Sequence, residues 1–152
     1  MEPRPLGTIR KILISSLLAG STGTLIELLL IGHDEMAAQL APLVLLGGGI
    51  IVALWALVAP GALVIRTVQL LMVIFMASGI IGIVLHYEGN QAFELEMSPT
   101  RAGISLISKT LTGATPVLAP GSMSLLGLVG LAFTHRHPAL RSAGLFTSEE
   151  EA

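Results

Sequence analysis

Four long runs of apolar residues are the feature that most constrains this chain. Each run is long enough for a helix to cross the hydrocarbon core of a bilayer, which is about 30 Å thick and needs roughly 20 residues. Only 12% of the residues are charged, about half the fraction found in typical soluble domains. Such a chain has too little polar surface to cover a water-soluble globule. The sequence therefore predicts a single all-α integral membrane domain with spans over about residues 12–31, 37–58, 62–86 and 115–134.

Prolines distinguish the fourth run from the others. Pro116 and Pro120 fall in its first half, and each proline removes one helical hydrogen bond. We therefore expect this helix to begin at Pro120 or to bend there. The links between the first three runs are only a few residues long, so those helices must be antiparallel neighbours.

The long connection between the third and fourth runs contains a further helix signal. Ser98 and Pro99 are a good N-cap and first helical residue. Ile104, Ile107 and Leu111 then recur at helical spacing. These residues predict a short helix lying in the membrane interface. An ordered polar loop is the alternative interpretation.

The distribution of charge predicts how the chain is oriented. Basic residues favour the cytoplasmic side of a membrane, and most of them fall on one side of the four predicted spans: Arg4, Arg10, Lys11, Arg66, Arg136 and Arg141. The other side receives Asp34, Glu35, Glu88, Glu94 and Glu96, together with Arg101 and Lys109 in the long connection. We expect both termini in the cytoplasm, in a bacterial inner membrane, and a disordered acidic tail over about residues 142–152.

Small residues at close spacing occur in every predicted helix. Helices in lipid associate by close packing through such residues, because lipid provides little hydrophobic drive between them. The pattern predicts a compact four-helix bundle, or helices that dock on other membrane subunits or on further copies of the chain. Examples are Ala19-xxx-Gly23, Gly49-xxx-Ala53 and Ser78-xxx-Gly82.

Glu27 is the most informative polar residue. It lies about one turn inside the end of the first span, where an unpaired carboxylate is costly. At 100° per residue it is about 20° from Gly20 and Ser16 around the helix. We therefore expect Glu27 to share their close-packed face and to point into the bundle, where burial would raise its pKa unless it meets a cation, a donor or a metal.

Histidines and carboxylates gather at the predicted extracytoplasmic ends of the first and third spans. His86 follows Gly82 by one turn, which leaves room for a flat haem or pigment ring. If residues 92–97 are extended, their two glutamates face the same way. Imidazole and carboxylate ligands suit zinc, iron, copper or manganese. The candidate metal ligands are Glu27, His33, His86, Glu88, Glu94 and Glu96, and the candidate cofactor ligands are His86 and Glu27. The alternative interpretation is a solvated polar collar at the membrane surface.

Several classes of function are excluded or left unsupported by the sequence. The chain has no cysteine, which excludes thiolate metal sites, Fe–S clusters and cysteine nucleophiles. A net charge of −2 without a basic block argues against a nucleic-acid partner. No phosphate-binding loop, serine elbow or dinucleotide motif is present, so we do not expect an enzyme.

Three functional hypotheses remain. The first is a small tetraspan protein that acts as a non-catalytic accessory, assembly or packing subunit of a larger membrane complex. The second is a protein that binds a metal or a haem-like cofactor, with a redox role, through Glu27 and His86. The third is a proton-coupled carrier with Glu27 as the titrating group, although internal repeats, which are common in carriers, are not evident.

Overall fold

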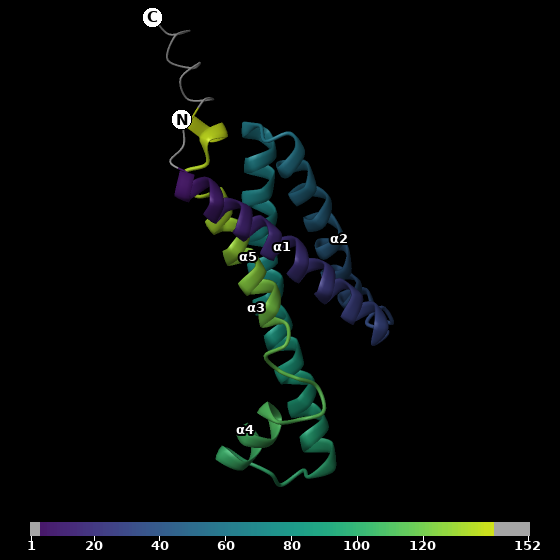
Figure 1. Ribbon diagram of the computed structural model, residues 1–152. Helices are drawn as coiled ribbons and strands as arrows, with labels where there is room; N and C mark the ends of the chain where they lie inside the picture. The colour runs from purple at the N-terminus through teal and green to yellow at the C-terminus, as the bar shows by residue number, and fades with distance from the viewer. Residues whose placement is uncertain (1–3, 142–152) are drawn as a thin grey trace, which may run out of the picture.

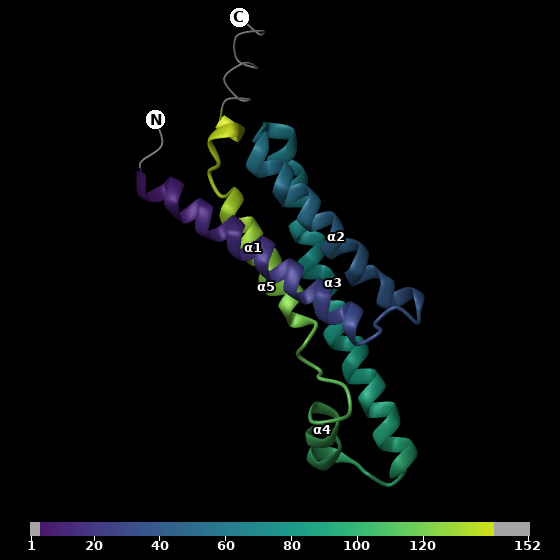
Figure 2. The same ribbon diagram turned by 45° about the vertical axis from the view of Figure 1, so that its right-hand side comes forward.

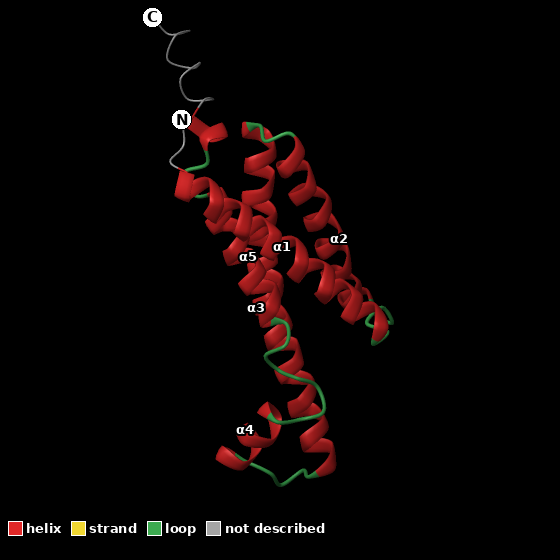
Figure 3. Cartoon of the chain, viewed as in Figure 1, coloured by secondary structure: helices red, strands yellow, loops and turns green. Residues whose placement is uncertain are grey.

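The computed structural model describes residues 4–141. Within this part of the chain all regular structure is helical, and loops join the helices (Figure 3). The main helices are α1 (Arg4–Leu30), α2 (Ala37–Val58), α3 (Ala62–Met97), α4 (Gly103–Leu111) and α5 (Gly121–Thr134).

The 36-residue helix α3 is the axis of the molecule (Figure 1). At 1.5 Å per residue its length is about 54 Å. Helix α5 packs along the middle part of α3, α2 packs against the beginning of α3, and α1 crosses α5 before it reaches the α1–α2 turn (Figures 1 and 2). The last part of α3 extends beyond this turn, and α4 lies beside it.

Three helices, α1, α2 and α3, are long and apolar enough to cross a membrane. Helix α5 has 14 residues and is about 21 Å long, which is short of the roughly 30 Å hydrocarbon core. The predicted membrane-spanning four-helix bundle is therefore not confirmed. The cause is the proline pair: residues between Pro116 and Pro120 form successive i→i+3 turns, and the helix begins only after them, at Gly121.

Helix α3 continues for eleven residues beyond the predicted end at His86. The added segment, residues 87–97, is rich in good helix formers and contains no proline. Residues 92–97 are therefore helical, and the extended conformation that would turn both glutamates the same way is not present. In a helix Glu94 and Glu96 are about 200° apart, so they face different ways. The predicted short helix in the long connection is present as α4, beginning at Gly103 rather than at Ser98.

Glycines bring α3 and α5 into close contact, as the small-residue pattern predicted. A Cβ placed on Gly82 of α3 would lie 2.6 Å from the Pro120 side chain. A Cβ placed on Gly127 of α5 would lie 2.6 Å from the backbone oxygen of Met72. The Ser124 hydroxyl also donates a hydrogen bond of 3.0 Å to the Met76 carbonyl. These contacts fix α5 against α3 along most of its length.

The described ends of the chain meet at one end of the molecule. The Arg10 guanidinium donates hydrogen bonds of 2.9 and 3.0 Å to the carbonyl oxygens of His135 and Arg136, just beyond the end of α5. These two residues form the turn that follows α5, where backbone carbonyls have no helical partner. The contact therefore ties α1 to the end of α5.

Candidate functional site

His33 and His86 are the two predicted ligands that the fold brings together. His33 lies in the turn between α1 and α2, and His86 lies on α3. Their ring centroids are 6.5 Å apart and the rings are tilted by 52°. Both side chains are half-buried. The pair joins two segments that are 53 residues apart in the sequence, at the level of the α1–α2 turn, beyond which the last part of α3 extends (Figure 1).

The end of α1 determines where His33 lies. Gly32 has a φ of +65°, the left-handed conformation that glycine adopts without strain. The His33 N–H bonds the Leu28 carbonyl at 2.9 Å, and the Gly32 N–H bonds the Leu29 carbonyl at 3.3 Å. This pattern is a Schellman motif, in which a left-handed glycine stops the helix. The backbone of His33 is thereby held directly beneath the last turn of α1.

A hydrogen bond from the ring orients His86. Its Nδ1 atom lies 3.1 Å from the Pro116 carbonyl oxygen. A carbonyl oxygen only accepts, so Nδ1 must carry the hydrogen and donate. In the neutral ring the lone pair is then on Nε2, the nitrogen that does not face Pro116. An N–H donated to a backbone carbonyl is the arrangement that commonly orients metal-binding histidines.

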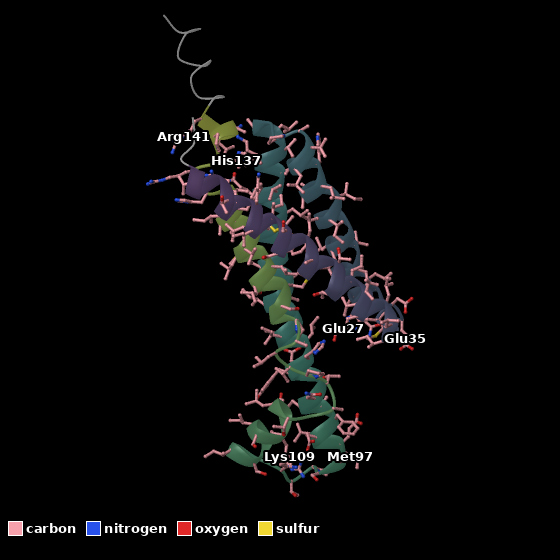
Figure 4. All side chains as sticks on the ribbon, in the orientation of Figure 1. Glu27, Glu35, Met97, Lys109, His137 and Arg141 are labelled. Carbon is pink, nitrogen blue, oxygen red and sulfur yellow. The ribbon has the colours of Figure 1, made fainter. Side chains whose placement is uncertain are left out.

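Glu27 does not point into the bundle, so the expectation from its helical face is wrong for this residue. Its side chain is exposed, and Figure 4 shows its position near the end of α1. Gly20, on the same face, does pack against the Leu126 side chain of α5, whereas Gly23 has open space around it. Because α1 crosses α5 at an angle, contact is lost within about one turn, and Glu27 lies beyond that point.

The three remaining glutamates do not join the histidine pair. Glu88 and Glu96 are exposed on the last part of α3. Glu94 forms an ion pair with Arg101, whose guanidinium also reaches the Ser98 hydroxyl at 3.3 Å. The ion pair closes the turn between α3 and α4. Within residues 4–141 no group of three or more His, Asp or Glu side chains is arranged to hold a metal ion.

Asn90 is a key residue that sequence reasoning did not single out. Its side chain is 3% exposed. Its amide nitrogen donates to the carbonyls of Thr110 and Thr115, at 2.9 and 2.8 Å. Its amide oxygen accepts from the backbone N–H and the hydroxyl of Thr115, at 3.1 and 2.7 Å. Gly113 packs directly on this amide. Asn90 therefore holds the end of α4 and the following loop against α3, and this loop carries Pro116, the partner of His86.

These features define a helical protein with three helices long and apolar enough to cross a membrane. At one end, Asn90 of α3 holds α4 and the loop that follows it. No protein-family model, curated protein or solved structure matches the chain.

Proposed function

We propose that this chain is a non-catalytic accessory subunit that packs against other subunits of a complex within a membrane. The observation that carries the proposal is the outer face of α1. Ser16, Ala19 and Gly23 are all exposed, and Gly23 has no atom within 4 Å of where its Cβ would be. At 100° per residue this face is about 180° from Ile14 and Ser21, which are buried against the rest of the chain.

Small residues on an exposed helix face favour contact with another helix over contact with lipid. They let two backbones approach closely, and close packing is the main source of association within a bilayer. Glu27 follows Gly23 by one turn on the same face, and burying its carboxylate in hydrocarbon without a partner would cost free energy. Little of α1 is covered by its own chain, since only 17% of its most apolar window is buried. A neighbouring subunit would cover the small residues and supply a partner for Glu27.

We also propose that the end of the molecule carrying Arg10 faces the cytoplasm of a bacterial cell. Arg66 lies in the first turn of α3, and Arg136 and Arg141 follow α5, all towards the end where Arg10 meets α5. This is the distribution of basic residues that the positive-inside rule associates with the cytoplasmic side.

The experiment is gentle purification of the tagged full chain from its native membrane, with quantification of the membrane proteins that accompany it. Gly23→Leu fills the open face of α1 and should remove a genuine partner while the chain itself stays folded. Leu29→Phe adds bulk at an exposed position about 120° away on the same helix, and should leave the partner bound. A chain that purifies alone or only with its own copies contradicts the accessory role, and so does a partner that is unaffected by Gly23→Leu.

Metal binding is the second candidate function, because one specific observation favours it: the approach of the His33 and His86 rings to 6.5 Å. A carrier function has less support, since Glu27 lies on the outside of the chain and a transport path past it would need further subunits.

A further inference from the structure

We infer that His33 and His86 form a binding site for a divalent transition-metal ion of the zinc class, which ties the α1–α2 turn to α3. Imidazole nitrogen is a preferred ligand of zinc, copper and nickel. The site is independent of the proposed packing role, because it lies in the turn after α1 and not on the exposed small-residue face.

The distance between the rings fits two ligands of one ion. Zinc binds imidazole nitrogen at about 2.0–2.1 Å, which places each ring centroid roughly 3 Å from the ion. Two ligands at a tetrahedral angle then have centroids about 5 Å apart, and two nearly opposite ligands about 6 Å apart. The observed separation is 6.5 Å. A small rotation of His33, which lies in a turn and whose ring forms no hydrogen bond within residues 4–141, closes the difference.

The hydrogen bonding of each histidine leaves a nitrogen free for the metal. His86 donates from Nδ1 to Pro116, so Nε2 holds the lone pair in the neutral ring. His33 is held through its backbone by the Schellman motif at Gly32, which leaves both ring nitrogens available. The other coordination positions of the ion would be filled by water, since zinc usually takes four ligands.

The structural effect of the ion follows from the segments it would join. His33 belongs to the α1–α2 turn, His86 belongs to α3, and Pro116 precedes α5. An ion held by both rings would therefore add a link between the α1–α2 turn and the part of α3 that already holds the loop before α5. A ligand that binds only the folded state raises its stability.

The test is equilibrium dialysis of the metal-stripped full chain, in a lipid nanodisc, against Zn²⁺. Wild type should bind one ion per chain, and Zn²⁺ should raise its unfolding temperature. His33→Ala and His86→Gln should each weaken binding at least tenfold and remove the thermal shift; glutamine at 86 retains an N–H donor for the Pro116 carbonyl. The matched control is His135→Ala, which removes an exposed imidazole at the opposite end of the molecule and should bind like wild type.

Two results would overturn the inference. One is that wild type takes up no more Zn²⁺ than the His33→Ala/His86→Gln double variant. The other is that only one of the two single substitutions weakens binding, because a shared ion requires both rings. Neither result depends on whether the chain has a partner subunit.

Discussion

Replacing Asn90 with alanine should release α4 from α3 while leaving the three long helices in place. The substitution removes four hydrogen bonds at once, two to carbonyls and two from Thr115. The bond to the Thr110 carbonyl is buried and the other three are partly buried. Thr115 itself is exposed, so its groups can bind water instead when Asn90 is lost.

The expected loss of stability for this local unit is about 2.5–3 kcal/mol. A buried hydrogen bond contributes about 1–1.5 kcal/mol net, and each of the three partly buried ones contributes about 0.5 kcal/mol, at the low end of the usual range. Since about 1.4 kcal/mol corresponds to a factor of ten, the open state of α4 should become roughly 60- to 140-fold more populated.

The assay uses the absence of cysteine from the chain. A single Thr110→Cys substitution places a thiol at a position that is 0% exposed, and it retains the backbone carbonyl that Asn90 binds. Thiol-specific labelling then reports how often α4 opens. Labelling should accelerate by the factor above when Asn90→Ala is added, whereas Glu88→Ala, an exposed change on the same turn of α3, should have no effect. Equal labelling rates in the two variants would refute the role assigned to Asn90.

Two further predictions concern the contact between α3 and α5 and the end of α5. Gly127→Ala should destabilise the protein by about 1–3 kcal/mol, because the new methyl group would lie 2.6 Å from the Met72 carbonyl oxygen. The control is Gly48→Ala, which meets no atom within 4 Å and should be neutral or stabilising. The unfolding temperatures of the two variants in detergent test this difference. Burial, and then the charge of Arg10, lower the pKa of His137, so the folded state binds its proton less readily than the unfolded state. The contribution of His137 to the free energy of unfolding should be complete above the ordinary histidine pKa of about 6.5 and should decline as the pH falls below it. The unfolding temperature should therefore fall less between pH 8 and pH 5 in His137→Gln than in the wild type. An unchanged pH profile would contradict this.

The helix of the second run was predictable to the residue, and the reasons are local. A span over about residues 37–58 was expected and Ala37–Val58 is observed, because the polar turn residues 32–35 precede the apolar run and Pro60 and Gly61 follow it. The end of the third helix was harder to predict. Hydropathy reports where a helix leaves lipid, but α3 continues in polar sequence until Met97, and only helix propensity distinguishes that segment from a loop.

The angular position of a residue on its helix was not enough to place Glu27. Gly20 and Glu27 share a face, yet Gly20 meets Leu126 and Glu27 is exposed. The missing quantity is the crossing angle between α1 and α5, which depends on packing along the whole interface. Asn90 was missed for a related reason. Its partners lie 20 and 25 residues away in the sequence, and nothing in the local pattern around it indicates them.

The histidine pair shows which part of a site between helices can be read from a sequence. That His33 and His86 lie at the same end of the long helices was predictable, because short links force neighbouring helices to be antiparallel. Whether the rings face one another depends on contacts made by other residues. Pro120 packs on Gly82, which brings the preceding loop against α3, and the Pro116 carbonyl in that loop then turns the His86 ring. A larger residue at Gly82 should therefore displace the loop, release His86 and weaken Zn²⁺ binding without altering either imidazole.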